Sequence, residues 1–278
     1  MEIGKMIRKA RKSRNMTQAN LAEGIISRTS IVKIENGVQN PSFETVEKIL
    51  ERLGLSIVEL YEFEHDSSEY EYNRILLSFK RLFNSTQVSE IDALIRSISQ
   101  FNAGVNNQVL SNIRIVLEVF KKIDSEDIKK LRAEVMPVWR YLEKIDNWSE
   151  IDLYLINFVL YYFDADTAEN IVKHAVKRID NNYPNLTSLK NAPLFNLTSL
   201  FLNQGNGVVA EKYVNESLLL SKNLNRFDLV YINQIRWALI NHDTSKLADT
   251  LHQLKGLDDE NLYQGMLKEI QNYNNKYQ

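Results

Sequence analysis

The sequence contains no cysteine. This absence excludes disulfide bonds, thiolate nucleophiles and cysteine-ligated metals, and it is compatible with a reducing compartment. Glycine and proline are also scarce, with nine and four residues in a chain of 278. Because tight turns depend on these two residue types, their scarcity favours long helices over a turn-rich β-protein.

Long apolar segments are missing as well. The stretch "MEIGKMIRKARKSR" at residues 1–14 lacks the apolar core of a secretory signal. The longest apolar run, "LYLINFVLYYF" at 153–163, is too short to span a bilayer and contains Asn157. We therefore expect a cytoplasmic protein without a membrane partner.

Patterns typical of enzymes and metal sites are absent from the sequence. The four histidines, at positions 65, 174, 242 and 252, form neither a His-x₃-His nor a His-Glu-x-x-His motif. "NQGNG" is too short and isolated for a phosphate loop, and acidic pairs such as Glu126/Asp127 resemble helix starts. We expect no catalytic residues, no metal and no cofactor.

Charge is distributed unevenly along the chain. Residues 1–36 contain eight Lys or Arg and three Glu, whereas the whole chain has a net charge of −2. A basic N-terminal module on an acidic body suggests a polyanionic partner for the module alone. By charge alone, a solvated basic helix face explains the pattern equally well.

Residues 1–63 have the start and stop signals of five short helices. The first covers about 3–13, and the others begin at Thr17, at Ser27, at Ser42 and within "SIVELYEF". Asn36-Gly37 ends the third helix and Gly54 ends the fourth. Residues 64–69, "EHDSSE", form the most linker-like stretch of the chain.

Residues 70–278 are also predicted to be helical, so the expected fold class is all-α. Starts are expected at Ser125, at Ser149 with Asp152, and at Asp164 or Asp166. The predicted helices cover 68–84, 87–101, 105–122, 125–145, 149–163, 166–181, 191–204, 207–223, 226–241, 245–255 and 259–275. Helix pairs repeating every 35–45 residues or so favour a tetratricopeptide-like domain, with an irregular helical bundle as the alternative.

Two helices joined by a tight turn after a basic helix are the layout of a helix-turn-helix, whose second helix enters the DNA major groove. The motifs Arg8/Arg11, Thr17-Gln18, Leu21-Ala22, Ile31/Ile34-Glu35, Gly37 and Pro41-Ser42 resemble the phage-repressor-like (Cro/cI, or xenobiotic-response-element) family. The resemblance covers nearly all of residues 3–60. It implies double-stranded DNA as a partner.

The match departs from the family pattern at two places. The segment from Leu21 to Glu35 is one residue shorter than the common form, and Val32 replaces a position that is often polar. In its shortened turn, its length and its helical C-terminal body, the chain resembles the Rgg/PlcR-type regulators of Gram-positive bacteria. That resemblance implies a homodimeric transcription factor whose repeat domain binds a short signalling peptide.

Several residues are candidates for DNA contacts. Arg28, Thr29 and Lys33 would reach bases or nearby backbone, and Gln18 would reach a phosphate, each with a solvated role as the alternative. Ser27 would contact DNA or act only as a helix cap. By the family resemblance Arg11 pairs with Glu35, with a phosphate contact secondary, and the generic electrostatic contributors are Arg8, Lys12 and Arg14.

The peptide site is predicted from amides and tyrosines spaced along helix faces. A bound peptide needs side-chain amides for its backbone and apolar pockets for its side chains. Three stripes fit this pattern: Tyr154, Asn157 and Tyr161; Asn196 and Asn203; and Asn233 with Arg236. The alternative is that these are ordinary exposed or capping residues of an Asn-rich sequence.

The sequence thus predicts a peptide-controlled, dimeric, sequence-specific DNA-binding regulator. One alternative is a constitutive DNA-binding repressor whose repeats dock another protein. Another is a protein-interaction module that uses the helix-turn-helix fold without DNA. The basic residues retained in the N-terminal module argue against the latter.

Overall fold

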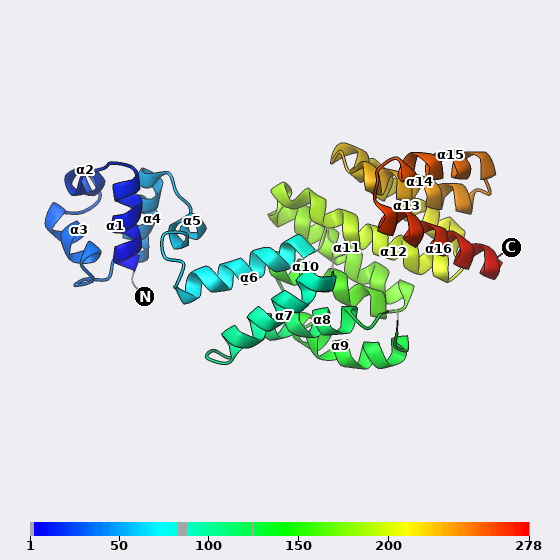
Figure 1. The fold of residues 1–278 in the computed structure, drawn as a ribbon, viewed down its shortest axis with the longest axis horizontal. Coiled ribbons are helices and arrows are strands. Elements are labelled where there is room, and N and C mark those ends of the chain that lie inside the picture. Colours follow the sequence, from blue (N-terminus) through cyan, green and yellow to red (C-terminus); the bar gives the residue numbers. More distant parts are fainter. Residues whose placement is uncertain (1–2, 83–87, 124, 278) are drawn as a thin grey trace. The chain divides into compact units, whose positions relative to one another are not determined.

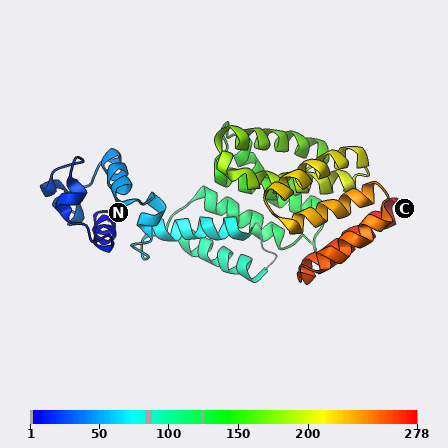
Figure 2. The ribbon, with the colours of Figure 1, turned by 90° about the horizontal axis from the view of Figure 1, so that it is seen from above.

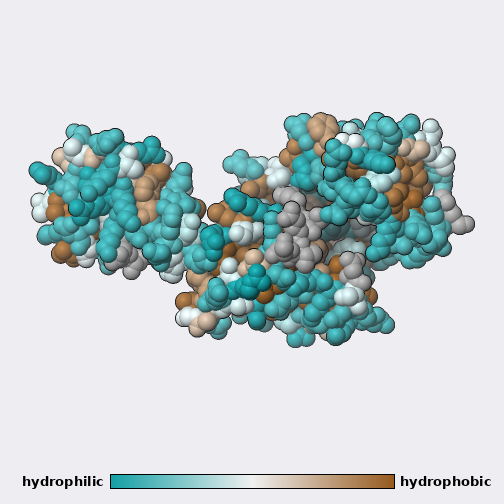
Figure 3. All heavy atoms as spheres, viewed as in Figure 1, coloured by the Kyte–Doolittle hydropathy of each residue, from teal (hydrophilic) through white to brown (hydrophobic). Residues whose placement is uncertain are grey.

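The computed structural model describes residues 3–82, 88–123 and 125–277, and across these ranges the regular structure is entirely helical. The chain divides into two compact units, Met1–Arg81 and Leu82–Gln278. Hydrophilic residues cover most of the face drawn in Figure 3, as expected for helices that bury one apolar stripe each.

The first unit contains five short helices and all but the last residue of a longer one (Figure 1). Their bounds are α1 (Ile3–Ser13), α2 (Gln18–Ala22), α3 (Arg28–Glu35), α4 (Phe43–Leu53), α5 (Ile57–Tyr61) and α6 (Ser68–Leu82). Thr17, Ser27 and Ser42 each cap a helix by accepting a backbone N–H three residues later. Gly54 ends α4 in the left-handed conformation, with φ +63°. The predicted helix starts in this unit are confirmed.

The core of the first unit is a single apolar cluster. Its fully buried members come from α1 to α5 and include Ile7, Leu21, Ile31, Ile49 and Leu60. These residues recur at helical spacing, so each short helix is held by burial of one face rather than by its own length.

Gly4 allows α1 and α3 to approach each other closely. A Cβ atom placed on Gly4 would lie 1.8 Å from the carbonyl oxygen of Ile34 and 2.7 Å from its carbonyl carbon. Both are backbone atoms of α3, which cannot rotate away as a side chain can. The position of α3 against α1 therefore depends on the missing side chain at residue 4.

The second unit is a succession of helices, seen from two sides in Figures 1 and 2. Their bounds are α7 (Val88–Asn102), α8 (Gln108–Phe120), α9 (Ile128–Leu142), α10 (Glu150–Val159), η1 (Leu160–Tyr162), α11 (Ala165–Asn182), η2 (Pro184–Lys190), α12 (Asn191–Asn203), α13 (Gly207–Asn223), α14 (Phe227–Ile240), α15 (Thr244–Lys255) and α16 (Glu260–Tyr277).

Neighbouring helices of this unit pack in sequence, as in a helical repeat. α7 packs on α8 and α8 on α9, and the same order continues from α11 through α15. Alternate helices also touch, α8 with α10 and α10 with α12. Stacked pairs whose alternate helices form an inner row are the architecture of tetratricopeptide-like repeats.

Three details refine the predicted helices of the second unit. Ser125 was expected to start α9, which is wrong, because Asp127 caps the helix through the N–H of Lys129 at 2.8 Å. Ser149 and Asp152 form the expected capping box. Asp164 rather than Asp166 caps α11. The predicted helix end at residue 84 and the predicted helix start at residue 87 lie outside the described residues.

Candidate functional site

A buried ion pair joins the first and third helices of the N-terminal unit. Arg11 Nε and Nη2 donate to the two carboxylate oxygens of Glu35 at 2.6 and 2.8 Å, and Nη1 donates to the Met16 carbonyl at 2.6 Å. The Glu35 side chain is fully buried. Burial alone would raise the pKa of Glu35, but hydrogen bonds from Arg11 and Gln18 outweigh it and lower that pKa.

Gln18 belongs to the same network. Its Nε2 donates to Glu35 at 2.9 Å, and its side chain is half-buried at the start of α2. The expected pairing of Arg11 with Glu35 is confirmed. A phosphate contact by Gln18 or Arg11 stays a prediction.

The outer face of α3 is free of the core. Arg28, Thr29 and Lys33 are exposed, whereas Ile31 and Ile34 are buried. Ser27 caps the helix by accepting the N–H of Ser30 at 3.1 Å. The helix therefore presents two cations and a hydroxyl to solvent, beginning at its electropositive N-terminus.

The other basic candidates lie along and after α1. Arg8, Lys12 and Arg14 are all exposed. The charge of Arg8 acts on Glu35, and that of Arg14 acts on Glu59 at the start of α5. Arg14 therefore lies near the start of α5, and Arg8 lies near the end of α3.

The second unit contains a cavity of about 670 Å³. Its wall takes side chains mainly from α8, α10, α12 and α14 of the inner row, and also from α6, α7, α16, η1 and η2. Members of the wall include Leu117, Phe120, Tyr154, Asn157, Phe158, Tyr161, Asn196, Phe195, Ile232 and Leu262. Most of these side chains are apolar or aromatic, so the cavity suits a hydrophobic ligand.

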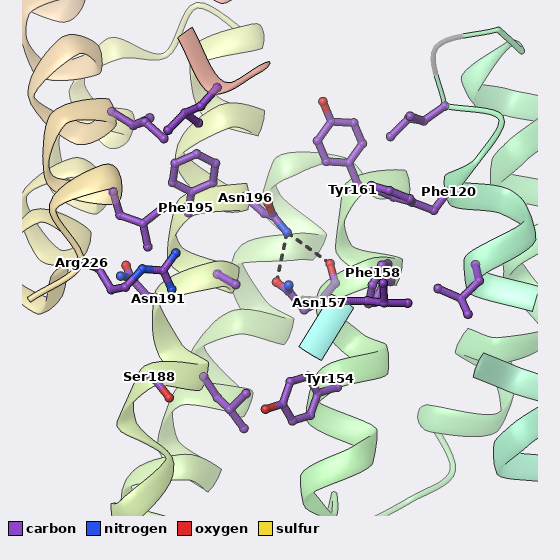
Figure 4. Close-up of a pocket in the computed structure, with 18 of the residues that line it drawn as sticks. Phe120, Tyr154, Asn157, Phe158, Tyr161, Ser188, Asn191, Phe195, Asn196 and Arg226 are labelled. Carbon is purple, nitrogen blue, oxygen red and sulfur yellow. Dashed lines mark hydrogen bonds between the residues drawn. The ribbon is translucent and has the colours of Figure 1, made fainter. Parts of the chain in front are cut away.

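Two amides meet inside this cavity. Asn196 Nδ2 donates to Asn157 Oδ1 at 3.0 Å and to the Asn157 carbonyl at 3.2 Å (Figure 4). Among the described residues, no hydrogen-bond partner is present for Asn157 Nδ2 or Asn196 Oδ1. One donor and one acceptor are therefore available, the complement of a peptide unit.

The cavity has little net charge. Arg226 is the one charged residue among the described lining side chains, and its Nε and Nη2 donate to Asp228 at 2.9 and 2.6 Å. Burial is the larger cause, and the neighbouring Tyr161 the smaller, of a pKa of Tyr162 raised to about 12. This phenol of the cavity wall therefore stays neutral at physiological pH.

Comparisons with known proteins bear on the N-terminal unit and on the overall fold. Residues 7–60 match the family model described as Helix-turn-helix. These residues are a helix-turn-helix domain.

The whole chain shares its fold with solved structures. Bacillus thuringiensis PlcR in complex with the peptide PapR7 and DNA superposes with a TM-score of 0.73 at 15% identity, covering 97% of this chain and 98% of that one. A putative transcriptional regulator from Listeria monocytogenes EGD-e gives 0.69 at 19% identity, with 99% and 98% coverage. The SHP pheromone receptor Rgg2 of Streptococcus dysgalactiae gives 0.68 at 14%, with 97% and 99% coverage. The chain thus combines a helix-turn-helix domain with a helical repeat domain in the same order.

Four of the seven predicted peptide contacts lie in the cavity of the repeat domain, and three do not. Tyr154, Asn157, Tyr161 and Asn196 line it. Asn203 is exposed at the end of α12, where its carbonyl accepts from Lys276 at 2.5 Å and from Tyr277 at 2.7 Å.

Asn233 and Arg236 belong to buried networks outside the cavity lining. Asn233 donates to Ser217 at 3.0 Å and to the Leu229 carbonyl at 2.9 Å. Arg236 is 2% exposed, pairs with Glu269 at 2.7 Å and lies over the ring of Phe195, 3.8 Å from its centroid. Both side chains support the packing of α14.

Sequence reasoning missed several residues of the cavity wall. Phe120, Phe158, Phe195 and Arg226 line the cavity and were not among the predicted peptide contacts. Phe158 lies one residue after Asn157 and Phe195 lies one before Asn196 (Figure 4). An aromatic residue next to each amide was the available signal.

Within the described residues, no helix is both long and apolar enough to cross a bilayer. Over the same residues, no group of three or more His, Asp or Glu side chains could hold a metal ion.

Proposed function

We propose that this chain is a dimeric, sequence-specific DNA-binding transcriptional regulator of the cytoplasm, controlled by a short signalling peptide. The observation that carries the proposal is the pairing, in one chain, of an exposed basic recognition helix with an apolar cavity containing two amides. The fold of the solved structures, two of which are named as a peptide and DNA complex and a pheromone receptor, supports it.

The DNA-binding part rests on α3. Its anchors Ile31 and Ile34 hold one face in the core, so Arg28, Thr29 and Lys33 project from a fixed helix. A rigid helix with cations at its start is suited to base and phosphate contacts in the major groove. Ser27 supports the helix as its cap.

The peptide part rests on the inner row of the repeat domain. Asn157 and Asn196 offer a donor and an acceptor to a peptide backbone, while Phe120, Phe158 and Phe195 offer apolar surface. A concave, mostly apolar cavity of this volume favours a short peptide over a second folded protein, which would need a broad surface.

The helix-turn-helix domain at residues 7–60 supports the proposed dimer. One domain per chain reads one half-site, so two chains related by a two-fold axis are expected on a pseudo-palindrome with half-sites roughly 10 bp apart or a multiple of that. Light scattering of the free protein tests this: a monomer at DNA-binding concentrations contradicts it.

Selection from a random-sequence duplex pool tests the DNA-binding part. The wild-type protein should enrich a pseudo-palindromic sequence and bind it with a steep salt dependence. If no sequence is enriched above a scrambled duplex, the proposal fails. A library of short synthetic peptides, screened for raising the melting temperature, then identifies ligands of the cavity.

A further inference from the structure

The turn between α2 and α3 is held by a side chain from another helix. Arg52, in α4, donates Nη1 to the carbonyl of Asn20 at 3.0 Å and also to the carbonyl of Glu23. Asn20 lies within α2 and Glu23 is its C-cap residue. One guanidinium nitrogen therefore bridges two backbone carbonyls, one within α2 and the other at its C-cap.

These two carbonyls are among those that the turn leaves without a backbone N–H donor. Ala19 accepts the N–H of Glu23 at 3.0 Å, and Ala22 accepts the N–H groups of Ile25 and Ile26 at 2.9 and 3.0 Å. In the part of the chain that the structure describes, no backbone N–H donates to Asn20 or Glu23. A helix C-terminus needs partners for such carbonyls and favours a cation there.

The position of Glu23 matters because the chain changes direction immediately after it. Gly24 has φ +70°, and residues 23–26 alone separate α2 from the cap of α3 at Ser27. This is the turn that is one residue shorter than the common family form. A shorter turn has fewer backbone torsions that could compensate for a change in the orientation of Glu23. The direction of the Glu23 carbonyl therefore sets where α3 begins.

The helix that carries Arg52 is itself rigid. Ile49 and Leu53, on either side of Arg52 in α4, are buried in the core at 0% and 3% exposure. On the other side of the turn, Ile25 and Ile26 pack against the same core. The turn is thus held between an apolar contact and a charged hydrogen-bond donor.

We infer that Arg52 is a positioning residue for DNA recognition: it holds the shortened turn and so sets the pose of α3. This rests on the proposed function, because the pose of α3 matters to the readout only if α3 binds DNA. Arg52 acts through the backbone of α2 and does not need to touch DNA. Arg52 would thus contribute to recognition from α4, outside the two helices of the motif.

The test compares Arg52→Gln with wild type on two duplexes, the sequence that wild type enriches from a random pool and a scrambled version. Losing a charge-assisted hydrogen bond at the turn should weaken binding to the enriched duplex by about tenfold, with binding to the scrambled duplex changed little. Arg52→Lys, which retains a cationic donor, should recover most of that loss.

Two further measurements separate positioning from other roles. Lys48→Gln removes a cation from the same helix, one that pairs with Glu44 rather than with the turn between α2 and α3. Lys48→Gln should bind as wild type does. The salt dependence of Arg52→Gln should have the wild-type slope, whereas a lost phosphate contact would lower it by about one.

The outcomes are separable. If wild type enriches no sequence, the proposed function fails and Arg52 is not at issue. If wild type enriches a sequence and Arg52→Gln binds it equally well, the inference is wrong. Equal losses in Arg52→Gln and Lys48→Gln, or a slope lowered by about one in Arg52→Gln, also overturn it, because either means that Arg52 contributes charge alone. An unchanged melting temperature shows that the domain remains folded.

Discussion

Arg11 and Glu35 form a two-bonded ion pair, at 2.6 and 2.8 Å, that joins α1 to the last residue of α3. Because the Glu35 carboxylate is fully buried, replacing Arg11 by Met leaves a charge without its partner. We expect Arg11→Met to lower the free energy of unfolding of the N-terminal domain by about 3–5 kcal/mol, measured by urea unfolding. Arg11→Met/Glu35→Gln should lose clearly less. An equal loss in both variants would show that the pair is not coupled.

The same carboxylate makes the domain sensitive to acid. The folded protein lowers the pKa of Glu35 below its ordinary value, so the carboxylate contributes stability above that value and loses it as the pH falls through the lowered pKa. We expect wild type to lose stability below pH of about 4.3, by more than Glu35→Gln does. Melting curves across this range measure the difference. Parallel curves for the two proteins would contradict the assignment.

Gly4 and Gly265 should respond in opposite ways to alanine. At Gly4 the added methyl group would clash with the Ile34 backbone, whereas at Gly265 in α16 nothing lies within 4 Å. Gly4→Ala should destabilise the N-terminal domain by about 1–3 kcal/mol and weaken DNA binding by displacing α3. Gly265→Ala should stabilise the repeat domain by about 0.4–1 kcal/mol. A neutral Gly4→Ala in thermal unfolding would refute the close approach.

Arg28 and Arg8 should differ in what they contribute to DNA binding. If Arg28 contacts a base, Arg28→Ala should lose about 1–3 kcal/mol on the enriched duplex and discriminate less between duplexes. Arg8→Ala should weaken all duplexes alike and reduce the salt slope by about one. Fluorescence anisotropy at several salt concentrations measures both. Unchanged affinity of Arg28→Ala for the enriched duplex would remove Arg28 from the base-reading set.

Asn196 and Asn203 provide a matched pair on α12. They lie seven residues apart in the sequence, but Asn196 lines the cavity and Asn203 is exposed at the helix end. Asn196→Leu should weaken a library-selected peptide by about tenfold, since it removes an acceptor for the peptide backbone. Asn203→Ala should bind like wild type. Calorimetry with the selected peptide measures both, and a larger loss at Asn203 would place the ligand elsewhere.

Much of the fold could be predicted from the sequence, because its signals are local. Caps such as Thr17, Ser27 and Ser42, and apolar residues at helical spacing, define helix limits within a few residues. The Arg11–Glu35 pair came from a family resemblance rather than from spacing, since the two residues are 24 positions apart.

The candidate sites were less predictable, because they depend on which helices meet. A stripe of amides shows that residues share a helix face but not where that face points. Asn157 and Asn196, from two different helices, meet in the cavity. Asn233 and Arg236 also share a helix face, but that face is buried in packing networks. Gly4 and Arg52 act on the backbone of other helices, and nothing in their local sequence indicates those partners.

The central claim is that a peptide in the cavity changes DNA binding. The most direct measurement is the dissociation constant of the wild-type protein for its enriched duplex, with and without a saturating library-selected peptide. The account predicts a change of about fivefold or more, in either direction. At a peptide concentration near the wild-type dissociation constant for that peptide, Asn196→Leu should reduce that change without altering the peptide-free value. Duplex affinity that is identical with and without bound peptide would contradict it.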